Sequence, residues 1–273
     1  MNKRFSLSLL LFFSILFSFG QVSICSWNLM NFGKSKSDAE IEFIAVTLNK
    51  FDIVAIQEVV AGNGGAQAVA RLVDELNRKG SHWDYAISDP TTSDNPSSVE
   101  RYAFVWKPSK VKKVGDSWLE QNFQREIDRE PYMSSFEYEG KPFTVASFHA
   151  VPKKKIPESE IKYFKSIPAL YPKLNIIFMG DFNCPQSNSA FTPLKNQGYQ
   201  TSLTNQKTSL RQKCKNDDCL ASEYDNMFYD YKKNRVLQSG ILPFYSSFPT
   251  LKEARQISDH IPIWSTFQIE SRE

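Results

Sequence analysis

Short apolar segments that each end in an acidic, amide or histidine residue recur along this chain and limit the folds open to it. In one of them, IIFMGDFNCP (176–185), four apolar residues and a glycine lead directly to Asp181 and Asn183. On extended backbone these two side chains project to the same face, and Phe182 points to the other. A carboxylate and an amide oxygen on one face can bind a hard cation, but the same residue types also cap helices and close turns. The segment therefore predicts a buried strand that ends either at a binding site or at a turn.

Predicted strands and helices alternate through the rest of the chain. The predicted helices cover 38–50, 65–80 and 158–167, and the predicted strands cover 22–28, 51–58, 101–107, 132–138, 143–150, 175–181, 224–230 and 261–269. Ser37 or Asp38 is the expected cap of the first helix, and the turn-rich residues 88–98 predict a surface loop. Because no clear break interrupts the alternation, we expect one α/β (α+β) domain over residues 21–271.

Polar residues stand at the end or at the beginning of most of these strands. Strands end at Asn28, Glu58, His149 and Asp181, one begins at Asp225 and Asn226, and Asp259 and His260 directly precede the last. A single polar residue at a strand end means little, because strands end at water anyway. In layered α/β folds, however, functional sites collect where several strand ends meet. The whole set therefore predicts a shared polar site.

Five of these segments resemble the successive signatures of the endonuclease/exonuclease/phosphatase superfamily. They are SWNLMNFG, AIQEV, SFHAVP, MGDFNCP and SDHIPIW, and they occur in the family's order across nearly the whole chain. The ordered set is far more specific than any one of its members. The resemblance implies a four-layer sandwich, in which two mixed β-sheets pack face to face and helices flank them. It also implies divalent-metal-dependent cleavage of phosphate esters.

Two further segments, ERYAFVWKP (100–108) and REP (129–131), are similar to the deoxyribonuclease I branch of this superfamily. That resemblance implies a metal and phosphate centre, two carboxylate–histidine pairs and a phosphate-contacting arginine. The implied centre consists of Asn28, Glu58, Asp181, Asn183 and Asp259, the pairs are Glu100 with His149 and Asp225 with His260, and the arginine is Arg129.

Phosphodiester hydrolysis makes the same demands on residue type. The site must neutralise the anionic substrate, deprotonate water and stabilise the leaving oxygen. Oxygen ligands suit Mg²⁺, Mn²⁺ or Ca²⁺ rather than zinc; we expect Mg²⁺ to be the working ion, with Mn²⁺ as an alternative and Ca²⁺ in a supporting or structural role. Histidine titrates near neutral pH. We expect His149 to activate water and His260 to stabilise the phosphorane or protonate the leaving oxygen, although the two roles can be exchanged.

The substrate is less firmly predicted than the reaction. The deoxyribonuclease I pattern has an arginine soon after its QE pair and a tyrosine before its ERY segment, whereas this chain has Val59, Val60 and Ser98. Lys153–Lys155 can contact phosphates or form a solvated face. We expect DNA as the partner, bound weakly and without sequence preference. A sphingomyelinase-like or other small-molecule or lipid phosphodiesterase or phosphatase is the alternative, and an inactive binding module is a third. The sequence indicates no protein partner.

The N-terminus has the pattern of a secretory signal peptide. Lys3 and Arg4 precede fifteen apolar or small residues that end before Gly20. This segment is shorter than the roughly 20 residues that span a bilayer, so we expect cleavage rather than membrane anchoring. Removal of residues 1–20 leaves 31 basic and 30 acidic residues, a net charge of +1, in a secreted or periplasmic protein.

Export permits disulfides among the four cysteines. Cys214 and Cys219 enclose the short segment KNDD, and a disulfide between them is the favoured interpretation. Cys184 can instead pair with either of them, and Cys25 is expected to be a buried apolar residue.

Overall fold

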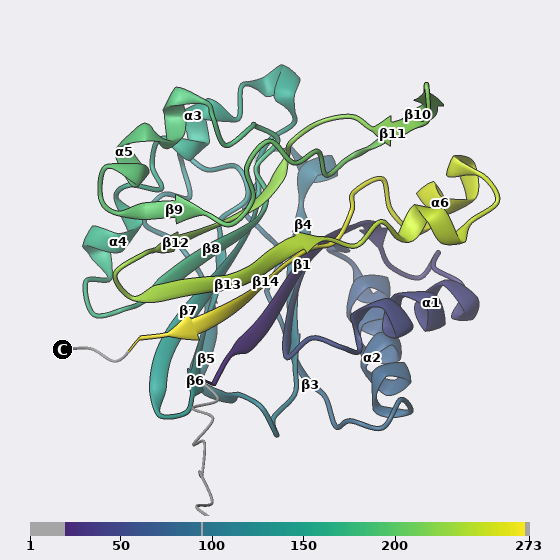
Figure 1. Ribbon diagram of the computed structural model, residues 1–273, viewed down its shortest axis with the longest axis horizontal. Coiled ribbons are helices and arrows are strands. Elements are labelled where there is room, and N and C mark those ends of the chain that lie inside the picture. Colours follow the sequence, from purple (N-terminus) through teal and green to yellow (C-terminus); the bar gives the residue numbers. More distant parts are fainter. Residues whose placement is uncertain (1–19, 94, 271–273) are drawn as a thin grey trace, which may run out of the picture.

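Two β-sheets lie face to face between two layers of helices in the computed structural model, which describes residues 20–93 and 95–270 (Figure 1). Residues 1–19 of the predicted signal peptide lie outside the described residues, as does residue 271 at the end of the predicted domain. The order helix, sheet, sheet, helix confirms the four-layer sandwich.

Each large sheet has six strands. The first contains β1 (Val22–Phe32), β2 (Ile53–Val60), β3 (Asp84–Ile87), β4 (Glu100–Trp106), β13 (Asn234–Ile241) and β14 (Ile263–Ile269), in the order β13-β14-β1-β2-β4-β3. The second contains β5 (Lys112–Leu119), β6 (Tyr132–Tyr138), β7 (Lys141–His149), β8 (Ile176–Asp181), β9 (Tyr199–Thr201) and β12 (Asp225–Asp230), in the order β5-β6-β7-β8-β12-β9. Two further strands, β10 (Leu210–Lys215) and β11 (Asp218–Leu220), form a separate hairpin.

The helices divide between the two outer faces. The first sheet is covered by α1 (Asp38–Leu48), α2 (Asn63–Asn77) and α6 (Leu251–Ile257), and the second by α3 (Glu158–Ile161), α4 (Ile167–Leu170) and α5 (Thr192–Lys195). Short 3-10 turns occupy Pro96–Ser98, Lys153–Lys155, Ser189–Phe191 and Phe244–Ser247. Three apolar clusters fill the spaces between layers, and aromatic side chains such as Phe104, Phe136 and Phe143 pack between the sheets.

The start of α1 shows why the first helix forms where it does. The Ser37 side chain accepts a hydrogen bond from the Glu40 N–H at 3.3 Å, and the Glu40 carboxylate accepts one from the Ser37 N–H at 2.7 Å. This reciprocal arrangement satisfies backbone donors that a helix start otherwise leaves unpaired. Of the two expected caps, the structure uses Ser37.

Two sequence expectations about secondary structure were wrong or incomplete. The single helix expected over 158–167 is instead two four-residue helices, α3 and α4. Pro168 in the first turn of α4 has no N–H to donate, so it suits the start of a new helix better than the continuation of an old one. Six strands were not expected: β3, β5, β9, β10, β11 and β13. Of these, β5 and β13 are edge strands whose mixed polar sequences lack a buried apolar run.

Strand direction brings the polar strand ends to one edge of the sandwich. β1 and β2 are parallel, as are β7 and β8, so their carboxyl ends point the same way. β4 and β12 run antiparallel to these neighbours and begin where the neighbours end, so that Glu100 lies opposite Val60 and Asp225 lies opposite Asp181. This register confirms that the strand ends meet at a common edge.

A glycine controls how closely two of these strands approach. Gly180 precedes Asp181 in β8 and has a φ of +136°, a conformation that side chains disfavour. A Cβ atom built on Gly180 would lie 1.9 Å from the carbonyl oxygen of Phe148 in β7. Glycine is therefore required for β7 and β8 to lie side by side at the point where they deliver His149 and Asp181.

The β10–β11 hairpin is closed by a disulfide. Cys214 and Cys219 are bonded, which confirms the favoured pairing, while Cys25 and Cys184 are buried thiols. The turn residues Asn216 and Asp217 have φ values of 49° and 63°. Two successive left-handed residues are the pattern of a type I′ turn, which suits the natural twist of a two-residue hairpin.

Among residues 20–93 and 95–270, no helix combines the length and the apolar character needed to cross a bilayer.

Candidate active site

A cleft of about 770 Å³ opens at the edge where the strand ends meet. Eight of the ten site residues expected from the sequence line it: Glu58, Glu100, Arg129, His149, Asp181, Asn183, Asp259 and His260. Asn28 and Asp225 lie behind this lining, 0% and 2% exposed, and both hydrogen bond to lining residues. The structure therefore brings all ten together, while their individual roles stay predictions.

The first carboxylate–histidine pair joins the two sheets. His149 at the end of β7 places Nδ1 2.9 Å from an oxygen of Glu100, which begins β4. Its Nε2 then faces the cleft, 3.4 Å from Asp181 Oδ2 and 3.9 Å from Glu58 Oε1. Because a carboxylate accepts the proton on Nδ1, the neutral imidazole presents an unprotonated Nε2 to the cleft.

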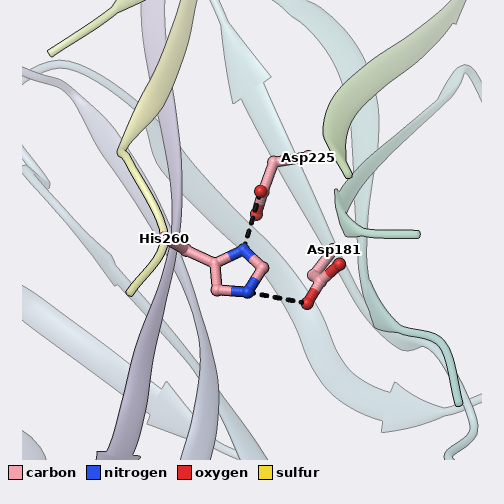
Figure 2. Close-up of side chains that lie close together, drawn as sticks. All are labelled: Asp181, Asp225 and His260. Carbon is pink, nitrogen blue, oxygen red and sulfur yellow. Dashed lines mark hydrogen bonds and ion pairs between the residues drawn. The ribbon is translucent and has the colours of Figure 1, made fainter. Parts of the chain in front are cut away.

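The second pair has the same construction on the other side of Asp181. His260 Nδ1 lies 2.8 Å from Asp225 Oδ2, and His260 Nε2 lies 3.4 Å from Asp181 Oδ2 (Figure 2). The Thr208 hydroxyl donates to the same Asp225 oxygen at 2.7 Å. This second bond fixes the carboxylate and, through it, the plane of the imidazole.

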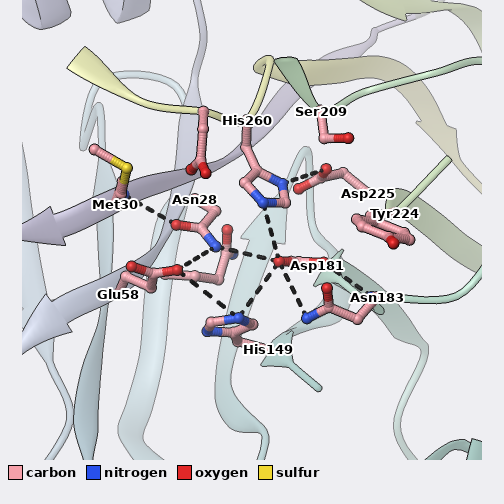
Figure 3. A network of polar contacts seen from close by, with 12 residues as sticks. Asn28, Met30, Glu58, His149, Asp181, Asn183, Ser209, Tyr224, Asp225 and His260 are labelled. Atoms are coloured by element: carbon pink, nitrogen blue, oxygen red, sulfur yellow. Dashed lines mark hydrogen bonds and ion pairs between the residues drawn. The ribbon is translucent and has the colours of Figure 1, made fainter. Parts of the chain in front are cut away.

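Asp181 is the common contact of the network (Figure 3). Four nitrogen atoms surround its Oδ2: those of Asn28 at 3.2 Å, both histidines at 3.4 Å and Asn183 at 3.5 Å. Its Oδ1 accepts from the Asn183 backbone N–H at 2.9 Å. Nitrogen atoms from four separate segments thus converge on the Asp181 carboxylate, which makes it the centre of the network.

The two asparagines present nitrogen rather than oxygen to the carboxylates. Asn28 Oδ1 accepts from the Met30 N–H at 3.0 Å, so its amide nitrogen turns to Glu58, at 2.9 Å, and to Asp181. Asn183 Nδ2 donates to the Ala150 carbonyl at 3.0 Å. In this arrangement the Asn28 amide nitrogen positions two acidic side chains of the predicted centre.

Several residues of the site have unusual backbone conformations. Glu58 has a φ of 58°, Asn183 one of 48°, and Met30 and Asn31 have 42° and 53°. Residues other than glycine rarely adopt positive φ, and such strain concentrates at functional sites. The turn at Asn31 lets its N–H donate to Glu58 Oε2 at 2.9 Å. The strained backbone therefore aims the Glu58 carboxylate into the cleft.

The donor set fits a hard divalent cation. Glu58 is 23% exposed at its side chain and points into a cleft that the carboxylates of Asp181 and Asp259 also line. Carboxylate oxygens with room for water are the ligands that Mg²⁺ and Ca²⁺ prefer. One atom each of Asp181, Asp225 and His260 also lie within 4.8 Å of one another. Since both ring nitrogens of His260 already face carboxylates, Glu58 with Asp181 is the better candidate for the ion.

Arg129 and Asp259 are more constrained than the sequence suggested. Arg129 is 5% exposed, donates from Nε to the His149 carbonyl at 2.9 Å and from Nη2 to the Ala150 carbonyl, and lies 3.2 Å from Glu100. Asp259 is paired with Arg255 at 3.2 Å. Arg129 thus ties the end of β7 to Glu100, and only its edge reaches the cleft.

The two histidines differ in protonation. Burial lowers the pKa of His149 to about 4, and the nearby Arg129 charge acts in the same direction. Burial also opposes the charged form of His260, but Asp225 and Asp181 together outweigh it and raise the pKa well above its usual value. Burial raises the pKa of Glu100 to about 7, against the influence of Arg129. At neutral pH one imidazole is neutral and the other carries a proton on each nitrogen.

Three supporting residues were missed by the sequence interpretation. Ser258 donates to the Asn28 carbonyl at 2.5 Å and accepts from the His260 N–H at 2.9 Å, and the Tyr102 hydroxyl accepts from the His149 N–H at 3.2 Å. Thr208 supports Asp225, as described above. Ser258 belongs to the SDHIPIW segment and could have been singled out there. Tyr102 likewise belongs to the ERYAFVWKP segment. Thr208 reaches the site only through the tertiary fold, so no local pattern marks it.

Comparisons with known proteins relate the chain to deoxyribonucleases by sequence. No family model matches the chain. Deoxyribonuclease gamma of Rattus norvegicus is 27% identical to it, over 97% of this chain and 89% of the relative. A deoxyribonuclease of Thioalkalivibrio sp. (strain K90mix) is 25% identical, over 90% of this chain and 70% of the relative.

Solved structures share the fold. An endonuclease/exonuclease/phosphatase family protein from Bacteroides thetaiotaomicron superposes with a TM-score of 0.66 at 17% identity, covering 92% of this chain and 99% of that chain. A mannosyl-6-phosphatase from the same species reaches a TM-score of 0.62 at 18% identity, over 90% of this chain and 99% of that chain. The fold is that of the endonuclease/exonuclease/phosphatase proteins, and the resemblance drawn from the sequence is confirmed. Taken with the deoxyribonuclease relatives, it indicates a phosphodiester-hydrolysing enzyme.

Proposed function

We propose that this protein is an exported, divalent-metal-dependent deoxyribonuclease that hydrolyses DNA phosphodiester bonds without sequence preference. The observation that carries the proposal is the symmetrical arrangement around Asp181. Two imidazole Nε2 atoms, each held by a carboxylate at Nδ1, lie 3.4 Å from the same oxygen. This places a proton acceptor and a proton donor on two sides of the Asp181 carboxylate, facing the cleft that a phosphate would enter.

The chain's own residues then have separate tasks. The neutral His149 takes a proton from water at Nε2, while Glu100 holds the ring and stabilises the positive charge that develops. The charged His260 donates from Nε2 to the phosphate or to the leaving oxygen, and Asp225 keeps that ring in place. The opposite protonation of the two rings favours this assignment over the exchanged one.

Glu58 and Asp181 would hold the metal ion, with Asp259 lining the same cleft. When bound, the ion supplies positive charge that stabilises the phosphate anion and lowers the pKa of water. Asn28 supports this by donating to both carboxylates, so that their oxygens keep a fixed separation. Export rests on the pattern of residues 1–20, from Lys3 and Arg4 to Gly20.

DNA as the substrate is supported by the two deoxyribonuclease relatives, which align over most of this chain. It is also supported by the placement of the ERY and REP segments, because Glu100 and Arg129 from these segments meet at His149. Incubation of the purified protein with plasmid DNA, RNA and a lipid phosphodiester, in Mg²⁺ with and without a chelator, tests the proposal. We expect plasmid nicking that the chelator abolishes and that added Mg²⁺ restores. Cleavage that persists in chelator would contradict the metal dependence.

A second candidate function is hydrolysis of a smaller phosphoester. It is favoured by Val60, which lines the cleft and is 39% exposed at the position where the resemblance would place a basic residue. A mannosyl-6-phosphatase shares the fold, so the fold alone does not decide between the two. If plasmid and single-stranded DNA stay intact while a lipid or sugar phosphoester is cleaved, this second function replaces the first.

A further inference from the structure

The β10–β11 hairpin carries a concentration of basic residues that the hydrolytic centre does not use. Residues 207–220 contain four basic and two acidic side chains: Lys207, Arg211, Lys213 and Lys215 against Asp217 and Asp218. The hairpin projects away from both six-stranded sheets, at the upper right of Figure 1. We call residues 209–220 the basic arm.

The charges at the far end of the basic arm are available to a partner. Asp218 is shared by Lys207, at 2.6 Å, and Arg211, at 3.3 Å. Lys213 and Lys215 are exposed, and neither makes an ion pair within the part of the chain that the structure describes. Isolated lysines on a surface usually remain solvated, so the position and rigidity of the arm must carry the argument.

The basic arm is rigid for so small an element. The Cys214–Cys219 disulfide closes its end, next to a two-residue turn. At its base, the Leu210 N–H donates to the Asp259 carbonyl at 2.7 Å, and Arg255 Nη1 of α6 donates to the Leu210 carbonyl at 2.8 Å. A pre-ordered arm loses little conformational freedom when it binds a partner.

The base of the arm adjoins two residues that line the active site, Asp259 and His260. Ser209 forms an isolated β-bridge with His260 (Figure 3). The preceding residue, Thr208, donates to Asp225. Lys154 and Lys155 line the cleft as well. A polyanion that crosses the cleft and passes His260 therefore continues toward Lys213 and Lys215.

We propose that the basic arm binds the phosphate backbone of duplex DNA beyond the scissile bond, and so replaces the positive charge that the cleft lacks at Val60. This inference rests on the proposed deoxyribonuclease function. Lys213 lies four residues beyond Ser209, which is at most about 13 Å along an extended strand. Since each DNA strand carries one phosphate per roughly 3.4 Å of axis, the arm reaches phosphates about four base pairs from the reacting one.

The test compares two double variants of equal charge. K213Q/K215Q removes the two unpaired lysines of the arm, and K112Q/K232Q removes two lysines at the opposite edge of the sandwich, where β5 begins and β12 has ended. Binding to a duplex of about 20 base pairs is measured by fluorescence anisotropy in a His149→Ala background, across a salt series. Turnover of DNA and of bis(p-nitrophenyl) phosphate is measured in the native background.

We expect K213Q/K215Q to lower the slope of log affinity against log salt by up to about 1.8, or 0.9 for each lost phosphate contact. Its affinity deficit should then shrink by roughly tenfold between about 50 and about 200 mM salt. KM for DNA should rise while turnover of the small diester stays unchanged. K112Q/K232Q should match the parent in all three measurements.

The outcomes separate this inference from the function on which it rests. If DNA is cleaved and K213Q/K215Q behaves like K112Q/K232Q, the arm is not a DNA-binding element and the deoxyribonuclease proposal stands. If only the small diester is cleaved, the nuclease function fails. If, in addition, K213Q/K215Q does not change the salt slope of DNA binding, the proposed DNA-binding role of the arm is overturned as well. An equal loss of small-diester turnover in K213Q/K215Q would show damage to the centre and would also overturn the inference.

Discussion

The two carboxylate–histidine pairs on either side of Asp181 share one construction but differ in what surrounds them. In each pair a buried carboxylate contacts Nδ1 and leaves Nε2 at 3.4 Å from Asp181. Next to Glu100, however, stands the guanidinium of Arg129, at 3.2 Å. Next to Asp225 stands the neutral hydroxyl of Thr208, at 2.7 Å.

The same pair of residue types also has two protonation states. Burial is the larger influence that holds the pKa of His149 at about 4, and the positive charge of Arg129 acts in the same direction. At His260 the nearby carboxylates of Asp225 and Asp181 outweigh burial and raise the pKa. The balance between burial and the charges around each ring therefore separates a proton acceptor from a proton donor.

Removal of either imidazole should have the largest effect. His149→Ala and His260→Ala should each lower the rate by about 10²–10⁴-fold, the usual contribution of a general acid or base, and leave the fold intact. Because both act on one phosphate, the double variant should lose much less than the product of the two effects. Initial rates at saturating metal test this. A tenfold or smaller loss in both single variants would remove this cleft as the active site.

Replacement of Arg129 should bring the pKa of His149 closer to that of His260. Arg129→Met leaves Glu100 without its ion pair and should destabilise the protein by about 3–5 kcal/mol. It should also raise the pKa of His149, because a neighbouring positive charge is lost, and so move the acid limb of the rate profile to higher pH.

Arg129→Lys is the matched control for this change. It keeps the charge but cannot bond to the His149 and Ala150 carbonyls together, so the acid limb should stay near its original pH while stability falls. Denaturant melts and pH–rate profiles distinguish the two. An acid limb that does not move in Arg129→Met would show that Arg129 does not set the protonation of His149.

On the other side, Thr208→Val should loosen the second pair. The variant removes the hydroxyl that donates to Asp225 and that accepts from the N–H groups of Tyr224 and Asp225 at 3.1 and 2.9 Å. Loss of a buried hydrogen bond to a charged group costs about 1.5–3 kcal/mol. Thr208→Ser retains the hydroxyl and should recover both stability and rate. Equal defects in the two variants would assign the effect to packing instead.

The smallest expected effect is on how stability depends on pH. The pKa of His149 is about 4 in the folded state and about 6.5 when unfolded, so the unfolded state binds more protons between these values. This residue makes stability rise with pH over that window. The raised pKa of His260 has the opposite sign, because its contribution is complete below about pH 6.5 and is lost as pH rises through the folded value.

His149→Gln and His260→Gln isolate these contributions. His149→Gln should flatten the rise between about pH 4 and 6.5, and His260→Gln should flatten the fall above about pH 6.5, each by at most about 1.4 kcal/mol per pH unit. Chemical denaturation in chelator across this pH range measures both slopes. Parallel curves for the two variants would contradict the opposite protonation of the rings.

Much of the centre was predictable because its residues end strands. Glu58, His149 and Asp181 each follow an apolar run, and parallel pairing of β1 with β2 and of β7 with β8 carries them to one edge. The sequence therefore contained both the residue types and the reason for their meeting. The same logic predicted the four-layer fold, while edge strands such as β5 and β13, which bury little, carried too weak a pattern.

The details of orientation were not predictable from the sequence. The direction of the Asn28 amide depends on the Met30 N–H, which reaches it only because Met30 adopts a positive φ. The position of Arg129 depends on its hydrogen bonds to the carbonyls of His149 and Ala150 at the end of β7. In the sequence, β6 and β7 separate Arg129 from these two carbonyls. Such contacts are set by backbone geometry and by residues distant in the chain, which single-sequence patterns do not record.

The close approach of β7 and β8 at Gly180 has a consequence for how this enzyme can change over time. No reactive atom belongs to Gly180, yet a single added methyl group would meet the Phe148 carbonyl and force the two strands apart just before His149 and Asp181. A lineage can thus lose activity while it retains every acid, base and ligand. The presence of every motif in a descendant of this chain would therefore not establish that the descendant is an active enzyme.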